Sequence, residues 1–226
     1  MSSAVATTGL AELFLTDEAA ERHPDLAAHA TALVTDEVMA ALAQTVSPQG
    51  VVGVAETLDV PLDAVLRARP ELVAVLAYAR DPGNAGTIVR TADAAGADAV
   101  VFPDDSVDPY NPKCVRSSAG SLFHLPVVAG GTVEETIAAL RSAGLTVRAT
   151  TAGAGTLLDA ADLRGPTAWV FGNEAWGLPD EVVTLADERV RVPIHGRAES
   201  LNLAIAAAVC LYASAREQRE PGGCRA

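Results

Sequence analysis

The sequence predicts an α/β protein with a small α/β domain over residues 1–66 and a larger doubly wound parallel sheet over residues 67–226. Two observations predict the larger domain. It contains six short apolar runs, which are typical of parallel strands covered on both faces. Helical stretches stand between several of these runs, as in a chain that alternates strand and helix. Half of all residues are hydrophobic, so the chain can bury a sizeable core.

Short alternating elements are expected in the first part of the chain. The expected strands are 12–15, 33–34 and 51–55, and the expected helices are 18–32 and 36–44. Glu18 stands in the first turn of one helix, where the helix dipole favours an acidic side chain. Asp36 is expected to cap the other. Pro61 and Pro70 then bracket one short helix.

The larger part alternates between expected strands and expected helices. The strands are 72–77, 99–102, 125–128, 146–149, 168–171 and 190–194. The helices are 87–95, 133–143, 179–185 and 201–215. The last helix is almost entirely apolar, which predicts that it is buried on most sides.

Charge is unevenly divided along the chain. The net charge is −13, and residues 1–66 hold ten acidic side chains against Arg22 alone, which gives −9. The remaining residues hold nineteen acidic and fifteen basic side chains, which gives −4. This balance argues against nucleic-acid binding through bulk charge, although the second part can present a local basic patch.

Membrane, secreted and metal-binding classes are not favoured. No apolar run approaches the roughly 18 residues of a membrane span, and the first residues lack the basic region and apolar core of a signal peptide. The three cysteines, Cys114, Cys210 and Cys224, show neither an even number nor paired-ligand spacing. We therefore expect reduced cysteines, no bound metal and a cytoplasmic protein.

A first polar cluster, residues 81–84, follows the expected strand 72–77. In its plainest interpretation the segment is a turn, and Asn84 can cap the next helix. Thr87 and Arg90 are three residues apart and share a helix face. Because apolar residues flank Arg90, we expect its guanidinium to meet an anion, and its planar fork suits a phosphate.

A second cluster, residues 172–174, directly follows the expected strand 168–171. It can be only a loop, but Gly172 lets a ligand approach the backbone. Glu174 is a candidate for orienting a substrate hydroxyl. Residues 150–155 form another loop of small residues after a strand. They do not match the glycine-rich dinucleotide fingerprint, so a dinucleotide site is not expected.

A third cluster opens the apolar C-terminal helix. Ser200 can serve simply as the helix cap. Asn202 precedes small apolar residues, so we expect it to be buried and its amide to bond specific partners. His124 and His195 are interpreted as structural, Trp169 as core and Trp176 as rim.

Residues 81–92, 171–179 and 192–202 resemble the three ordered motifs of the SpoU (TrmH) RNA ribose methyltransferases, which belong to the SPOUT class. The resemblance covers residues 71–217. It implies an S-adenosylmethionine-dependent RNA 2′-O-ribose methyltransferase acting on rRNA or tRNA. It also implies a C-terminal trefoil knot, a rare exception to ordinary topology, and a homodimer with the site near the subunit interface.

The resemblance also implies two groups of site residues. The methyl donor would lie at Ala149, Thr150, Gly172, Val192 and Ile194, closed by Leu201. The substrate side, which includes the catalytic residues, would use Asn84, Arg90, Glu174, Ser200 and Asn202. The family's arginine has been proposed as a general base, but a guanidinium hardly ever deprotonates. We therefore expect Arg90 to hold a substrate phosphate and stabilise the developing oxyanion.

Residues 11–56 are similar to the later half of the small α/β RNA-binding domain that many of these enzymes carry. The first strand and helix of that domain do not appear in this sequence, so an incomplete domain is expected. Its acidity would repel phosphates. Two alternatives to RNA methylation stay open: a catalytically degenerate RNA-binding module of the same fold, and a methyltransferase for a non-RNA acceptor.

Overall fold

The computed structural model describes residues 10–43, 45–153 and 155–219. The chain divides into two compact units between Leu58 and Asp59, whereas the sequence placed the boundary between residues 66 and 67. The difference arises from α5 (Leu62–Arg67), whose Val65 is buried in the core of the second unit. Val60 also donates its backbone N–H to the Val127 carbonyl (2.9 Å), which fixes the segment before α5.

The first unit has a three-stranded sheet in the order β2-β1-β3. Strand β1 (Leu10–Leu15) pairs parallel with β2 (Ala32–Leu33) and antiparallel with β3 (Val51–Ala55). The three expected strands are thus present. The expected single helix over 18–32 is wrong, because α2 (Asp17–Arg22) and α3 (Pro24–Ala27) are separate helices. Pro24 lacks the N–H that would continue α2, so it starts a new helix instead.

Helix α4 (Asp36–Ala43) ends the helical part of the first unit. Asp36 was expected to cap this helix but lies within it. The Thr35 hydroxyl accepts the Val38 N–H at the helix start instead (3.4 Å).

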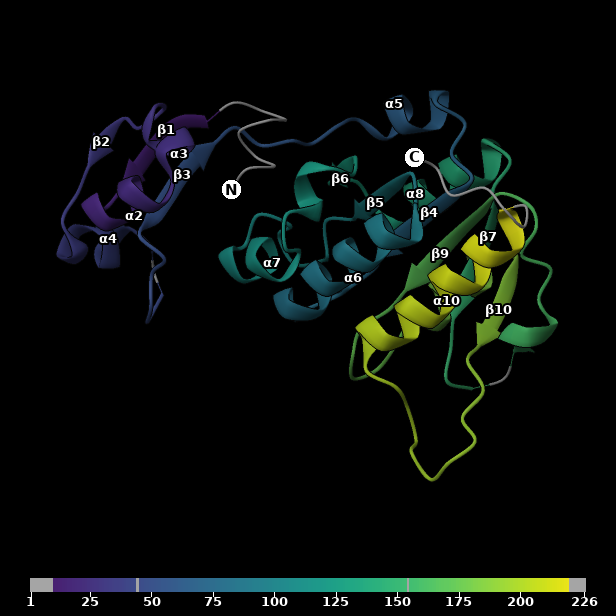
Figure 1. Ribbon diagram of the computed structural model, residues 1–226. Helices are drawn as coiled ribbons and strands as arrows, with labels where there is room; N and C mark the ends of the chain where they lie inside the picture. Colours follow the sequence, from purple (N-terminus) through teal and green to yellow (C-terminus); the bar gives the residue numbers. More distant parts are fainter. Residues whose placement is uncertain (1–9, 44, 154, 220–226) are drawn as a thin grey trace. The chain divides into compact units, whose positions relative to one another are not determined.

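The second unit is built on a seven-stranded parallel sheet in the order β6-β5-β4-β9-β7-β10-β8. Figure 1 labels these strands except β8. Its strands are β4 (Leu72–Leu76), β5 (Ala99–Phe102), β6 (Val127–Ala129), β7 (Thr146–Thr150), β8 (Thr156–Leu157), β9 (Thr167–Phe171) and β10 (Glu188–Arg191). This confirms the predicted parallel sheet. The two-residue β8 was not predicted, because so short a strand leaves no pattern in the sequence.

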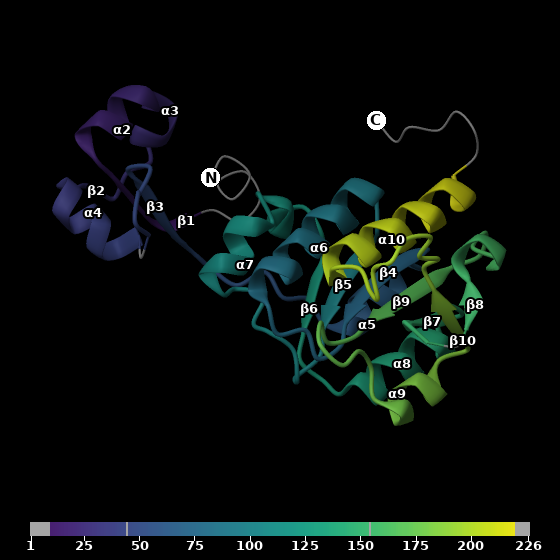
Figure 2. The ribbon, with the colours of Figure 1, turned by 90° about the horizontal axis from the view of Figure 1, so that it is seen from below.

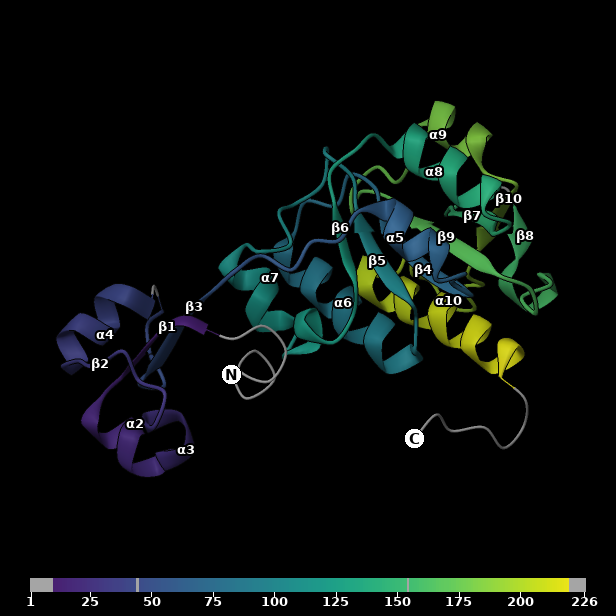
Figure 3. The same cartoon turned by 90° about the horizontal axis from the view of Figure 1, so that it is seen from above.

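Helices cover both faces of this sheet (Figures 2 and 3). One face carries α6 (Pro82–Ala95), α7 (Pro112–Ser117) and α10 (Leu203–Gln218). The other carries α5, α8 (Val133–Ser142) and α9 (Asp180–Leu185). The largest fully buried side chain, Trp169, lies on the α10 side and donates its indole N–H to Ser214 (2.9 Å). The doubly wound arrangement is therefore present. No helix among the described residues is long and apolar enough to span a membrane.

Helix α6 begins five residues before its expected start. Asp81 is its N-cap and accepts the backbone N–H of Asn84 (2.8 Å), with Pro82 at the first helical position. Asn84 therefore lies inside the first turn and is not the cap. Gly96, in the left-handed conformation, ends the helix.

Helix α10 differs from expectation in both its start and its burial. Its N-cap is Asn202, not Ser200. Ile205, Val209 and Tyr212 leave 53%, 39% and 53% of their surface exposed and lie along one face of the helix. The expected burial on most sides is therefore wrong for that face. The trefoil knot that the resemblance implies remains a prediction.

Candidate functional site

A cavity of about 470 Å³ lies at the carboxyl ends of β7, β9 and β10. Strands β4, β5 and β6 follow one another across the sheet in one direction, whereas the later strand β9 lies on the other side of β4, between β4 and β7. Ligands in open α/β sheets bind where strand order reverses in this way. The volume falls within the roughly 300–1,000 Å³ of typical small-molecule sites.

Five of the six residues predicted to hold the methyl donor line this cavity. They are Thr150, Gly172, Val192, Ile194 and Leu201. Val192 and Ile194 lie beyond the end of β10, not within a strand as predicted. Ala149 does not line the cavity, because it is buried in β7 and paired with Val170 and Arg189.

The loop from Gly172 to Leu178 forms one wall of the cavity and is tightly held. A Cβ on Gly172 would lie 2.7 Å from the Leu178 nitrogen, so the close approach requires glycine. Two backbone hydrogen bonds, of 2.7 and 2.9 Å, join Asn173 and Gly177. Asn173 also donates its side-chain amide to the Tyr78 carbonyl (3.0 Å). This role was not predicted, although Asn173 lies in the motif 171–179.

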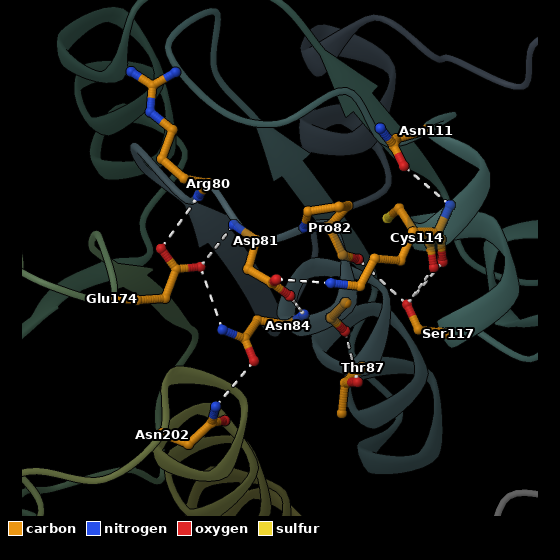
Figure 4. A network of polar contacts seen from close by, with 12 residues as sticks. Arg80, Asp81, Pro82, Asn84, Thr87, Asn111, Cys114, Ser117, Glu174 and Asn202 are labelled. Atoms are coloured by element: carbon orange, nitrogen blue, oxygen red, sulfur yellow. Dashed lines mark hydrogen bonds and ion pairs between the residues drawn. The ribbon is translucent and has the colours of Figure 1, made fainter.

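Glu174 joins the loop after β9 to the start of α6 (Figure 4). Its carboxylate accepts the backbone N–H groups of Arg80 (3.2 Å) and Asp81 (3.1 Å) and the Asn84 side-chain amide (3.4 Å). Glu174 also lines the cavity, so it stands between the ligand space and α6. Its predicted contact with a substrate hydroxyl stays a prediction.

Asn202 brings the third motif into the same cluster. Its side-chain N–H donates to the Asn84 amide oxygen (3.0 Å), as Figure 4 shows. Its own oxygen accepts the backbone N–H groups of Ala204 (2.9 Å) and Ile205 (3.3 Å). The specific bonding expected of Asn202 is therefore present, but its expected burial is wrong, because the residue is exposed.

Lys113 supports the cluster from α7 and was not predicted as part of it. Its ammonium forms an ion pair with Asp81 (2.8 Å). The hydrogen bond from Lys113, with that from the Asn84 backbone, lowers the pKa of Asp81 below its ordinary value. Asp81 thus stays ionised while it caps α6.

Arg90 is neither a lining residue of the cavity nor a bonded member of the polar cluster. Its side chain is exposed, whereas Ile88 and Val89 are buried on the opposite side of α6. The apolar residues that flank Arg90 in the sequence thus leave its side chain exposed. Its predicted contact with an anion stays a prediction. Within the described parts of the chain, no residue forms a hydrogen bond or ion pair with the Arg90 side chain. No described residue therefore competes with an anion for this guanidinium.

Ser200 is exposed at the edge of the cavity and does not cap α10. The structure thus gathers Asn84, Glu174 and Asn202 into one bonded cluster and places Ser200 on the cavity. Across residues 10–43, 45–153 and 155–219, no group of three or more His, Cys, Asp or Glu side chains is arranged to hold a metal ion.

The fold and the site define an α/β protein with a cavity of ligand size where strand order reverses, beside a polar cluster drawn from three separate segments. Residues 71–212 match the model of the SpoU rRNA methylase family. The chain belongs to that family.

Named relatives agree with this assignment. The chain is 39% identical over 189 residues to an uncharacterized tRNA/rRNA methyltransferase of Synechocystis, covering 82% of this chain and 67% of that protein. It is 35% identical over 180 residues to the 23S rRNA (guanosine(2553)-2′-O)-methyltransferase RlmP of Bacillus subtilis, covering 80% and 70%. An AdoMet-bound rRNA methyltransferase from Sinorhizobium meliloti superposes with a TM-score of 0.83 at 30% identity, covering 97% and 86%.

Proposed function

We propose that this protein is an S-adenosylmethionine-dependent 2′-O-ribose methyltransferase acting on rRNA or tRNA. One observation carries the proposal: the bonded cluster of Asn84, Glu174 and Asn202 stands directly beside a cavity of cofactor size. Membership of the SpoU rRNA methylase family supports it. Because the substrate is ribosomal or transfer RNA, we place the protein in the cytoplasm.

The cavity is suited to a ligand that has both polar and apolar parts. Thr150 and the loop after Gly172 offer backbone and hydroxyl groups, and Val192, Ile194 and Leu201 offer apolar surface. These residues would hold S-adenosylmethionine, which supplies an activated methyl group when bound. Glu174 and Ser200 line the same space and would face the acceptor.

The acceptor ribose must lose its 2′-hydroxyl proton while its oxygen gains negative charge. Arg90 is exposed and unpaired with any described residue, so it can meet a substrate phosphate at no cost in broken ion pairs. Bound to that phosphate, the guanidinium would stabilise the negative charge that develops on the ribose oxygen. Since guanidinium does not deprotonate, the proton leaves to another group or to solvent.

The test has two arms. Calorimetric titration with S-adenosylmethionine should show binding, and labelled donor should mark RNA in preference to protein or small-molecule acceptors. Mapping of ribose methylation across total RNA, with and without the gene, then identifies the nucleotide. Binding of RNA without any donor binding would favour the degenerate module, and labelling of a non-RNA acceptor would favour the other alternative.

We also propose a homodimer, in which the exposed apolar face of α10 is covered by a second copy. Ile205, Val209 and Tyr212 supply that face, and exposed apolar patches commonly mark protein interfaces. Light scattering should give twice the 23.1 kDa chain mass. Ile205→Asp should shift the protein toward monomer, and a wild-type monomer at micromolar concentration would contradict the proposal.

A further inference from the structure

An aromatic pair stands beside the cavity and has no role in the function proposed above. Trp176 lines the cavity and leaves 55% of its surface exposed. The Tyr78 ring packs against it at 5.5 Å between centroids, with an interplanar angle of 48°. The other tryptophan, Trp169, is fully buried. The indole of Trp176 is thus an exposed aromatic surface at the edge of the cavity, where a ligand can contact it.

The loop that carries Trp176 is fixed by its own hydrogen bonds. Asn173 and Gly177 bond each other on either side of Trp176, and the Asn173 amide oxygen accepts the Ala175 N–H (2.9 Å). A platform already fixed before binding loses little conformational freedom when a ligand arrives.

Tyr78 is held in an unfavourable backbone conformation. Its φ of 61° lies in the left-handed region, which is rare for a bulky residue. The Asn173 amide anchors the Tyr78 carbonyl from the same loop that carries Trp176. Strain of this kind is kept at functional sites when the surrounding structure holds it in place. In this backbone conformation the Tyr78 ring packs against the ring of Trp176.

Electrostatics around the pair favours a neutral ring as the ligand. Burial raises the pKa of Tyr78, and the charges of Glu134, Asp105 and Glu181 raise it further. Those carboxylates would repel a phosphate placed against the tyrosine. A nucleobase carries no charge, and its flat face matches that of the exposed indole.

We infer that Trp176, supported by Tyr78, is the surface on which a base of the RNA acceptor stacks. The inference rests on the proposed function for the identity of the acceptor. Stacking on an aromatic side chain tolerates any base, because every base has a π-face. The pair would therefore hold a base near the cavity without selecting its type.

Intrinsic fluorescence gives a direct test in the full chain, because Trp169 is buried and Trp176 is exposed. A twelve-nucleotide poly(A) RNA, added with S-adenosylhomocysteine present, should quench the emission. An abasic ribose–phosphate strand of the same length should not. Trp176→Phe should abolish the quenching but bind the RNA within about threefold, because it keeps an aromatic face. Trp176→Ala should bind the RNA about tenfold more weakly or worse when S-adenosylhomocysteine is present at saturating concentration.

Leu157→Ala is the matched control, since Leu157 is an exposed apolar residue of β8 outside the cavity lining. It should leave RNA binding unchanged. Quenching by S-adenosylhomocysteine alone would overturn the inference, because the methyl donor would then contact Trp176. Quenching that follows protein concentration would also overturn it, because a second copy of the chain would then cover Trp176. Equal RNA binding by Trp176→Ala would also overturn it. If base-dependent quenching occurs but no RNA is methylated, the proposed function fails and the stacking site stands.

Discussion

At the scale of single residues, Glu174 organises the polar cluster. One carboxylate accepts three N–H groups, two of them from the backbone just before α6. Charge-assisted bonds of this kind are stronger than neutral ones. Glutamine at this position would place an NH₂ group against N–H donors, so the geometry of Asn84 depends on the charge of Glu174. The cluster therefore positions the start of α6 relative to the cavity.

Arg90 gives the sharpest prediction at this scale. Arg90→Ala should lower the rate of methyl transfer about a hundredfold, the cost of losing one preorganised electrostatic donor. Stability and donor affinity should hardly change, because the side chain is exposed and unpaired with described residues. Arg90→Lys should restore little, since an ammonium cannot copy the bidentate fork. Rates should be compared with Arg67→Ala, another exposed helical arginine. Full activity of Arg90→Ala would refute the role.

The two described cysteines should be unreactive in the folded protein. Burial raises the pKa of both Cys114 and Cys210 from 9.0 to about 12. Ellman's reagent at pH 8 should therefore find almost no thiolate until the chain unfolds. Each thiol has a higher pKa in the folded chain than in the unfolded chain, so the unfolded chain loses its thiol protons first as the pH rises. The free energy of unfolding is therefore unaffected by these thiols below pH 9.0 and falls as the pH rises toward about 12. Cys224 lies outside the described residues, so the assay uses Cys224→Ser; fast labelling of that folded variant would contradict the prediction.

At the scale of elements, α6 and α7 pack closely enough to exclude a methyl group. A Cβ on Gly86 would lie 2.9 Å from the Ser118 nitrogen and would overlap Ser117 and the Cys114 carbonyl. Alanine favours a helix over glycine by about 1 kcal/mol, but overpacking costs about 1–3 kcal/mol. Gly86→Ala should therefore lower the midpoint of thermal unfolding. Thr87→Ala, on the exposed side of α6, should not lower this midpoint. A higher midpoint for Gly86→Ala would contradict the prediction and show that α7 can move away from α6 at little cost in free energy.

The strands could be predicted from sequence better than the helix ends could. Runs such as 99–102 are buried on both faces, and this leaves a continuous apolar pattern that the structure confirms. Helix starts depend on which polar side chain accepts which N–H. Asn84 was expected to cap α6, but Asp81 can accept the same kind of N–H bond, and only the fold shows that Asp81 is the cap. The anion contact of Arg90 was predicted from its apolar chain neighbours, but these point to other sides of the helix and leave the guanidinium exposed.

At the scale of the whole molecule, the two units carry charge differently. Residues 1–58 hold eight carboxylates and one basic side chain, Arg22. All eight carboxylates are exposed. Only Glu18, among the described residues of this unit, has an ion-pair partner, which is Arg22 at 3.8 Å. An acidic surface gains nothing from displacing the counterions of RNA, so the phosphate contacts should come from residues 59–226.

This division of charge predicts how RNA affinity responds to neutralising the first unit. The triple variant Glu18→Gln, Glu21→Gln, Asp25→Asn removes three exposed carboxylates. At 50 mM salt it should bind rRNA fragments as tightly as the wild type or more tightly. The binding affinities of the two proteins should converge toward about 0.15 M salt, where the screening length is about 8 Å. Arg22→Gln raises the negative charge and should shift affinity the other way or not at all. Weaker binding by the triple variant would show that the acidic face contacts RNA directly, through bonds from its carboxylates to base or ribose donors.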